Sequence, residues 1–201
     1  MSWIKEIKYE ESDKVLRQLY DRVKGPNNNI DNILSVHSLR PHSLLGHMNL
    51  YKNVLHNANN TLPKWYLETL GVYVSYLNEC SYCVEHHFEG LRRLVNDEVK
   101  SSKIMECVQS DQMEKCLEEK YAEGASYAKK LTLFNSPINE SDILSLRRTG
   151  LDDGEILEIN QVVSYFNYAN RTVLGLGVNT KGDILGLSPN DSNDSANWSH
   201  S

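Results

Sequence analysis

The sequence predicts an all-α protein, and three observations lead to this fold class. Apolar residues recur at intervals of three and four along most of the 201-residue chain, which is the period of an α-helix with one buried face. No segment alternates apolar and polar residues as a half-buried strand does. Pro41 and Pro63 stand where such a period begins, and Gly25–Pro26 stands where one ends, as expected at helix termini.

The expected helices follow in order along the chain. The first, 11–24, repeats apolar residues up to Val23 and is closed by Gly25–Pro26. A shorter helix, 30–39, precedes the one that Pro41 opens, which continues to Leu55. Pro63 opens the next helix, 63–77. The same period then predicts helices over 82–95, 98–108, 113–134, 141–148 and 153–174.

The chain is expected to form one domain over residues 1–187, because a chain of this length can bury roughly 70% of its unfolded surface in one core. Within it we distinguish an N-terminal helical extension (1–40) and two halves (41–110 and 111–187). Residues 188–201 are rich in Ser, Asn and Asp, with Ala196 and Trp198 as the two apolar residues. This composition predicts a flexible tail, or a tail whose Trp198 docks on a partner.

A short internal repeat predicts a duplication of helical halves. The segment Val-Ser-Tyr-Leu-Asn at 74–78 recurs as Val-Ser-Tyr-Phe-Asn at 163–167, 89 residues later. The two halves would then pack around a pseudo-twofold axis. Ala169 and Thr172 stand where the first half has Cys80 and Cys83, so thiol chemistry is confined to the first half.

Composition excludes several classes of function. The 21 Lys and Arg against 27 Asp and Glu give a net charge of −6, which argues against nucleic acid as a partner. No run of 18 apolar residues occurs, so no membrane span is expected. The first residues lack the pattern of a signal peptide, and four cysteines are too few for a secreted disulfide scaffold. We therefore expect a cytoplasmic protein.

One helix is apolar on nearly every side and carries a single charge. Residues 65–77 contain Glu68 as their only charged side chain, and Gly71 and Ser75 share its face. A buried carboxylate is costly to ionise without a partner, so Glu68 is a candidate proton carrier. The alternative is a carboxylate that caps the helix or reaches solvent.

A Cys-x-x-Cys pair begins the following helix. Cys80, Cys83 and His87 stand at i, i+3 and i+7, so they lie along one helical face. A thiol in the first turn of a helix is stabilised as the thiolate, and a second thiol three residues away can trap an oxidised sulfur as a disulfide. His87 can transfer a proton near neutral pH, and Glu68 can pass it on.

Zinc is the main alternative use of these residues. Cys80 and Cys83 could be joined by His86 or His87, but a structural zinc site needs four ligands, usually in two separated pairs. Cys107 and Cys116 are nine residues apart and do not form a second ligand pair. We interpret them as unreactive thiols, and His37, His42, His47 and His56 as ordinary histidines, of which one could line a pocket mouth.

These residues resemble the active-site pattern of the alkyl hydroperoxidase D-like family, within the carboxymuconolactone decarboxylase superfamily. The pattern in this chain is Glu68, eleven residues, Cys80-x-x-Cys83, three residues and His87. The motif Asn78-x-Cys80-x-Tyr82-Cys83-Val84-x-x-His87 is similar to that of the branch described as uncharacterised peroxidase-related proteins. The resemblance implies an all-α fold, assembly as homo-oligomers (dimer, trimer or hexamer), and no haem, flavin or metal.

The resemblance also implies roles for the residues of the pattern. Cys83 would form the sulfenic acid, Cys80 would protonate the leaving group and close the disulfide, and Glu68 and His87 would relay protons. The best-known members of the family have a histidine between the cysteines, where this chain has Tyr82. His86 points about 100° away from His87 on a helix, so we expect it at the surface or an interface.

The sequence thus predicts a cofactorless thiol peroxidase or disulfide reductase that acts on a small hydroperoxide or disulfide and is reset by an external dithiol. Two alternatives stay open. One is a non-catalytic helical module stabilised by zinc. The other is a decarboxylase or isomerase of the same superfamily, which has no need of paired thiols.

Overall fold

The computed structural model describes residues 2–200 and is built of α-helices. Within this range the only β-pairing is an isolated bridge between Pro189 and His200, so the predicted all-α class is confirmed. The helices are α1 (Lys14–Val23), α2 (Asn32–Ser35), α3 (Pro41–Leu55), α4 (Lys64–Leu77), α5 (Ser81–Val95), α6 (Glu98–Ser110), α7 (Glu119–Leu133), α8 (Glu140–Arg148) and α9 (Asp153–Leu176), with short 3-10 turns at Tyr9–Glu11, Pro26–Asn28 and Met113–Lys115.

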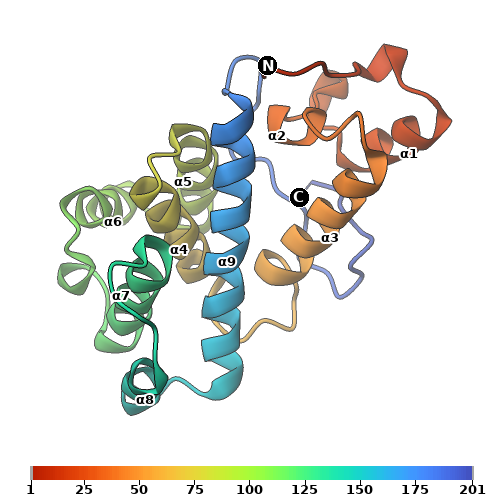
Figure 1. Cartoon of the computed structure of the whole chain (residues 1–201). Helices are drawn as coiled ribbons and strands as arrows, with labels where there is room; N and C mark the ends of the chain where they lie inside the picture. Colours follow the sequence, from red (N-terminus) through yellow and green to blue (C-terminus); the bar gives the residue numbers. More distant parts are fainter. Residues whose placement is uncertain (1, 201) are drawn as a thin grey trace.

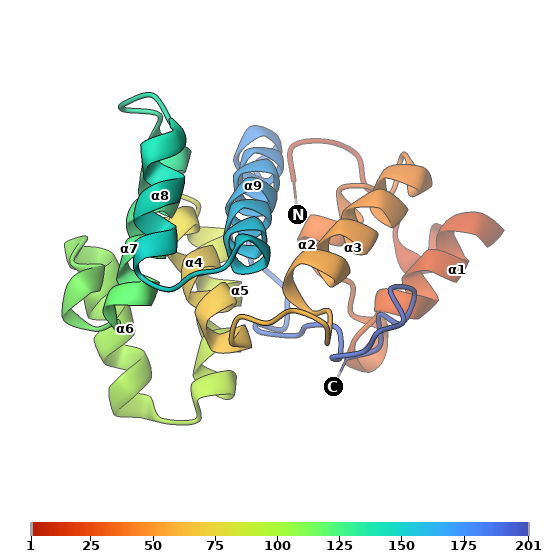
Figure 2. The same ribbon diagram turned by 90° about the horizontal axis from the view of Figure 1, so that it is seen from below.

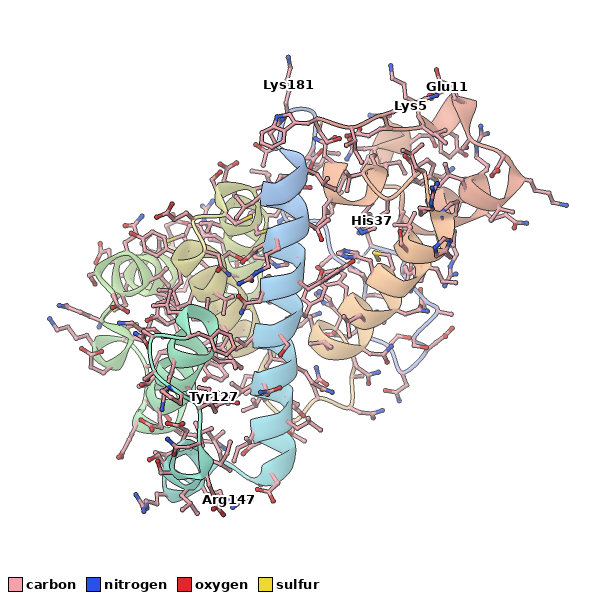
Figure 3. All side chains as sticks on the ribbon, in the orientation of Figure 1. Lys5, Glu11, His37, Tyr127, Arg147 and Lys181 are labelled. Carbon is pink, nitrogen blue, oxygen red and sulfur yellow. The ribbon has the colours of Figure 1, made fainter. Side chains whose placement is uncertain are left out.

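Helix α9 runs through the middle of the molecule, with α4 to α8 on one side and α1 to α3 on the other (Figure 1). It packs against α4, α7 and α3. On the α7 side, Tyr127 points toward α9 (Figure 3), where Asn160 donates a hydrogen bond to its hydroxyl at 2.7 Å. Gly177 ends α9 in the left-handed conformation, with φ +66°.

Helices α4 and α9 run in the same direction and lie close together. Near their first turns, Glu158 accepts a hydrogen bond from the backbone of Leu62 at 2.9 Å, and further along Asn170 donates one to Ser75 at 3.0 Å. Between these contacts, Gly71 faces the ring of Phe166: a Cβ at Gly71 would lie 2.2 Å from it. Glycine is required here because any side chain would push the two helices apart.

The two copies of the sequence repeat fall on these two central helices. Asn78 and Asn167, which are equivalent in the repeat, meet in space, since Asn78 Nδ2 donates to Asn167 Oδ1 at 3.0 Å. Asn78 also donates to Asn170 at 2.9 Å. The repeat therefore maps onto the packed α4–α9 pair, while the duplication of whole halves stays a prediction.

Two expected helices differ in length from the observed ones. The segment 113–134 is split, because Glu118 has an extended backbone (φ −63°, ψ 155°) and begins α7 separately from the turn Met113–Lys115. The segment 30–39 contains only the single turn of α2, followed by turns up to the start of α3. Local periodicity marks both segments as helical but does not locate these breaks.

The C-terminal strap, which we define as residues 186–200, differs from the expected flexible tail. It lies across α1 and α3 (Figure 2), and Trp198 is 1% exposed within a second apolar core. The residues of that core are Leu16, Tyr20, Val23, Leu34, Leu44, Met48 and Trp198. One tryptophan can bury as much apolar surface as several small residues, so a polar composition alone did not reveal this docking.

We expect the α4–α9 contact to be sensitive to a single methyl group. Gly71→Ala should lower the free energy of unfolding by about 1–3 kcal/mol, because the new Cβ overlaps the Phe166 ring. Gly46→Ala is the matched control, because Gly46 is exposed in α3 and no atom lies within 4 Å of the new Cβ. This variant should raise the free energy of unfolding by about 0.5–1 kcal/mol. Urea unfolding measures both, and equal effects would contradict this packing.

Candidate active site

A tight helix end places the cysteine pair. Helix α4 stops at Leu77, and Glu79 takes the left-handed conformation with φ +57°. The backbone N–H of Cys80 donates to the carbonyl of Ser75 at 2.9 Å, and that of Glu79 donates to Tyr76 at 2.9 Å, which is the double hydrogen bond of a Schellman motif. The end of α4 at Leu77 agrees with the helix expected over 63–77, and Cys80 becomes the N-cap of α5.

The two sulfur atoms of the pair lie 3.1 Å apart, and both thiols are buried, with Cys80 0% and Cys83 3% exposed. The hydrogen bond from the Cys83 thiol lowers the pKa of Cys80, the Cys83 backbone N–H adds to this, and burial opposes it. The same contact raises the pKa of Cys83, and burial raises it further. Asn170 and Ser75 act in the opposite direction by hydrogen bonding to Cys83.

Of the two thiols, Cys80 therefore loses its proton more readily. The sequence predicts a stabilised thiolate in the first turn of α5. The direction of the pKa shift agrees with this at Cys80, the N-cap residue, and contradicts it at Cys83, where the contact with Cys80 and burial raise the pKa. Cys83, one turn further, keeps its proton in the reduced pair. Oxidation at Cys83 therefore requires transfer of that proton, and the sulfur of Cys80 is the nearest acceptor.

Glu68 and His87 meet across the α4–α5 hairpin. The Nδ1 atom of His87 lies 2.8 Å from Oε2 of Glu68, and the Glu68 residue is 2% exposed. The predicted pairing of these two residues is thus present. A third residue joins them: His56, at the end of α3, has its Nε2 atom 3.8 Å from Oε1 of Glu68. Burial lowers the pKa of His56 well below its usual value, so this histidine is neutral.

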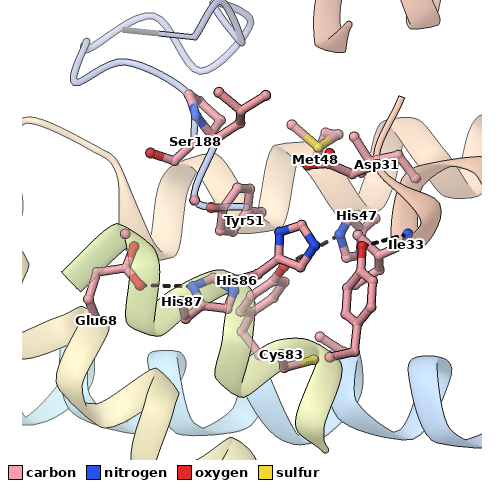
Figure 4. A pocket seen from close by; sticks show the side chains of 18 of the residues that line it. Asp31, Ile33, His47, Met48, Tyr51, Glu68, Cys83, His86, His87 and Ser188 are labelled. Atoms are coloured by element: carbon pink, nitrogen blue, oxygen red, sulfur yellow. Dashed lines mark hydrogen bonds and ion pairs between the residues drawn. The ribbon is translucent and has the colours of Figure 1, made fainter. Parts of the chain in front are cut away.

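Cys83, His87 and Glu68 line one wall of a cavity of about 60 Å³. Figure 4 shows this wall below and Asp31 and Ser188 on the other side of the cavity. Cys80 does not face this space. It lies instead beside a shallow hollow on the outer surface, with Tyr76, Val84 and Met105. The shared helical face thus brings both sulfurs together, but only Cys83 faces the cavity.

His86, on the same helix as Cys83 and His87, also lines the cavity, which contradicts its expected place at the surface. His86 is 9% exposed, and its Nε2 atom lies 3.2 Å from Oδ2 of Asp183. The Tyr82 hydroxyl donates to the same oxygen at 2.7 Å and accepts a hydrogen bond from the backbone of Ile33 at 3.1 Å. The turn that follows α9 folds back over α5 and covers this side of the helix, which periodicity within α5 does not reveal.

Tyr82 therefore has a positioning role in this structure. Its hydroxyl connects the cysteine turn to α2 through Ile33 and to the C-terminal region through Asp183. Burial raises the pKa of Tyr82 well above its usual value, so the hydroxyl is a hydrogen-bonding group and does not exchange protons near neutral pH. A histidine in its place would provide a titratable group between the cysteines.

Besides His56, three further residues of the site were not predicted individually from the sequence. His47 lines the cavity with its Nδ1 atom unpaired, and burial lowers its pKa to about 3. Tyr51 packs edge-on against both His56 and His87. Asp31 lines the far wall. Their helices are distant in sequence from the cysteine motif, so no local spacing marks them, although a histidine at the pocket was anticipated among His37, His42, His47 and His56.

The remaining candidates lie outside the cavity. Cys107 is buried and Cys116 is half-buried, and burial raises the pKa of Cys116 to about 12, consistent with an unreactive thiol. In residues 2–200, no group of three or more His, Cys, Asp or Glu side chains is arranged to hold a metal ion. Over the same range, no helix is long and apolar enough to cross a membrane.

No protein-family model matches the sequence, and no curated protein sequence matches it. Several solved structures are similar to the chain. An uncharacterized peroxidase-related protein with an alkylhydroperoxidase AhpD core, from Ralstonia eutropha JMP134, has a TM-score of 0.76 and 20% identity, covering 89% of this chain and 91% of that one. An uncharacterized peroxidase-related protein from Silicibacter sp. TM1040 has a TM-score of 0.73 and 21% identity, covering 90% and 93%.

The debrominase Bmp8, solved in complex with 2,3,4-tribromopyrrole, is also similar, with a TM-score of 0.61, 14% identity and 83% of each chain covered. These likenesses show that the chain has the helical fold of alkylhydroperoxidase-like proteins, as the sequence motif implied. They also show that one fold serves more than one reaction, so the reaction has to be argued from the site.

The cavity carboxyl group of Asp31 predicts a pH dependence of stability. Burial raises the pKa of Asp31 to about 6, above the value of about 4 in an unfolded chain. The folded protein therefore binds this proton more tightly, and that stabilisation, complete below pH ~4, is lost as pH rises through about 6. Asp31→Asn should leave the free energy of unfolding unchanged below pH ~4. Above pH ~7 it should raise that free energy by about 1–3 kcal/mol.

Urea unfolding at a series of pH values measures this difference. An equal gain at acidic and neutral pH would show that the contacts of the side chain, and not its ionisation, cause the effect.

Proposed function

We propose that this protein is a cofactorless thiol peroxidase that reduces hydroperoxides through the Cys80–Cys83 dithiol. One observation supports this most strongly: a protonated thiol, Cys83, faces a small cavity beside a carboxylate–histidine pair, with a second sulfur 3.1 Å behind it. A sulfenic acid formed in such a cavity has a resolving thiol within reach, which is the arrangement that dithiol peroxide chemistry needs.

The reaction begins with transfer of the Cys83 proton to Cys80. The Cys83 thiolate then attacks the terminal oxygen of the hydroperoxide, and the O–O bond breaks. Sulfur is oxidised to the sulfenic acid, the peroxide is reduced, and the departing alkoxide takes the proton held by Cys80 to leave as an alcohol. Cys80 is thereby a thiolate again, ready for the second step.

In the second step, the Cys80 thiolate attacks the sulfur of the Cys83 sulfenic acid. A disulfide bond forms and the S–O bond breaks, and the departing hydroxide takes up one proton to leave as water. The Glu68–His87 pair supplies this proton from solvent. Over both steps, the dithiol anion, one hydroperoxide and one proton are converted into the disulfide, one alcohol and one water molecule. An external dithiol then reduces the disulfide by thiol–disulfide exchange.

The surroundings of Glu68 favour this relay role. Its two oxygens face two different histidines, one at 2.8 Å and one at 3.8 Å, inside a helix that is buried along its length. Because burial holds His56 neutral, His87 is the histidine with which Glu68 exchanges a proton in this proposal. His87 is the more exposed of the two histidines, with 16% of its side chain accessible, so it connects the pair with solvent.

The two alternatives receive less support from this site. A structural zinc ion needs four ligands, and the described part of the chain contains no group of even three suitable side chains. A decarboxylase or isomerase would use the Glu68–His87 pair but would leave the adjacent sulfur atoms without a role. The proposal retains a cytoplasmic setting, where thiols are kept reduced, and assembly as a homo-oligomer.

Cysteine variants test the proposal directly. Cys83→Ser should abolish peroxide consumption with dithiothreitol as reductant, because serine cannot form a sulfenic acid. Cys80→Ser should oxidise more slowly at Cys83, because the proton acceptor is lost, and should accumulate a sulfenic acid because the resolving thiol is also lost; dimedone traps this acid as a covalent adduct visible by mass. Cys107→Ser is the control and should keep full activity. Full peroxidase activity in Cys83→Ser would refute the assignment.

Glu68→Gln tests the proton relay. It removes the carboxylate but keeps the shape of the side chain, so the fold should persist while the rate of disulfide formation falls about 100-fold, a typical loss when a general acid–base group is removed. Glu85→Gln, which changes an exposed glutamate on α5, is the matched control. A rate in Glu68→Gln equal to that of the control would exclude the relay.

A further inference from the structure

The C-terminal strap forms part of the wall of the active-site cavity. Gly186, Leu187, Ser188, Pro189 and His200 line it, opposite Cys83 and His87. Figure 4 shows Ser188 on a segment without helical structure that passes over Tyr51 and His87. The other walls come from α3, α4, α5 and α9 and the region of α2. The strap and the single turn of α2 are thus the walls of this cavity that are not built on a long helix.

One tryptophan anchors the end of the strap. Trp198 is inserted among the apolar side chains of α1 and α3, and the guanidinium of Arg22 lies 3.5 Å from its ring centroid. Such a stacked cation strengthens the hold on an aromatic ring. Arg22 also donates to the carbonyl of Ala196 at 2.6 Å. Two residues on, the Nε2 atom of His200 lies 2.9 Å from the carbonyl oxygen of Val23.

Polar contacts hold the strap closer to the cavity. Lys52, a fully buried lysine of α3, donates to the backbone carbonyl of Asn190. Lys64, at the start of α4, pairs with Asp191 at 2.6 Å. Asn190 is joined in turn to Ser199 by a backbone hydrogen bond of 2.8 Å, so the two arms of the strap move together. Release of Trp198 would therefore loosen the segment that covers Cys83.

The size of the cavity limits what can reach Cys83. Its volume of about 60 Å³ corresponds to a few water molecules, whereas a cavity that holds benzene measures about 150 Å³. Hydrogen peroxide fits this space, and so does a hydroperoxide with a very short alkyl group. A hydroperoxide that carries an aromatic ring does not fit unless one wall moves.

We propose that the C-terminal strap, anchored by Trp198, restricts the substrates to hydrogen peroxide and the smallest alkyl hydroperoxides. With the strap docked, these small molecules reach Cys83 and bulky aromatic hydroperoxides are excluded. Bulky substrates react only through the fraction of molecules whose strap is undocked, so their apparent kcat/KM is reduced by that fraction. This inference rests on the proposed peroxidase function and adds its substrate class.

The first test compares two substrates in Trp198→Ala. We expect kcat/KM for cumene hydroperoxide to rise at least about tenfold, because the undocked fraction is no longer small, while kcat/KM for hydrogen peroxide changes little. Trp3→Ala is the matched control, since Trp3 is an exposed tryptophan that does not line the cavity, and it should leave both values unchanged. If the ratio of kcat/KM for cumene hydroperoxide to kcat/KM for hydrogen peroxide is unchanged in a folded Trp198→Ala protein, the inference is overturned.

Arg22→Ala provides a second variant that keeps the apolar core intact. It removes the stacked guanidinium and the hydrogen bond to Ala196, so it should raise the ratio in the same direction by a smaller factor. Circular dichroism and thermal unfolding establish that both variants are folded. If Trp198→Ala does not fold, Arg22→Ala decides: an unchanged ratio in it overturns the inference.

A second measurement is independent of peroxidase turnover. The reduced protein is alkylated with iodoacetamide or with the bulkier N-phenylmaleimide, and the modification of Cys83 is located by mass. Both variants should raise the ratio of the maleimide rate to the iodoacetamide rate at Cys83, and Trp3→Ala should not. That result in a protein without peroxidase activity would refute the proposed function while supporting closure by the strap; an unchanged ratio would refute closure.

Discussion

The turn at Asn78–Glu79 is the constraint on which the site depends. It folds α5 back against α4, so residues equidistant from the turn face each other. Glu68, ten residues before Asn78, and His87, eight residues after Glu79, are close to such a pair, and they meet at 2.8 Å. The same turn ends α4 with two backbone hydrogen bonds and starts α5 at Cys80. One turn therefore positions both the carboxylate–histidine pair that we propose as the proton carrier and the cysteines that we propose as the redox pair.

The pairing of α4 with α9 holds this hairpin in place. Gly71 lets Phe166 approach α4 closely, and Phe166 packs edge-on against the His87 ring, with 4.5 Å between the centroids. Asn170, at the far end of the contact, is fully buried and hydrogen bonds to the Cys83 sulfur, lowering the pKa of that thiol against the stronger effects that raise it. Packing between the two central helices thus influences both the relay and the thiol.

The parts of the site that the sequence revealed are those set by local geometry. Helical spacing places Cys83 one turn from Cys80, and the apolar character of α4 identifies Glu68 as an unusual charge. The parts that it missed depend on contacts between distant segments. His56 meets Glu68 only because α3 packs beside α4, and His86 is buried only because Asp183 returns from beyond α9. Trp198 shows the same limit: its polar neighbours indicate disorder, and its own burial depends on a groove formed by α1 and α3.

The proposed function requires that Cys80 and Cys83 form a redox dithiol. The most direct test is a thiol count and an intact mass on the reduced protein before and after one equivalent of hydrogen peroxide, with the modified residues located by peptide mapping. Two thiols and two mass units should be lost, both at Cys80 and Cys83, while Cys107 and Cys116 stay reduced. Four free thiols and an unchanged mass after peroxide treatment would contradict the proposed function.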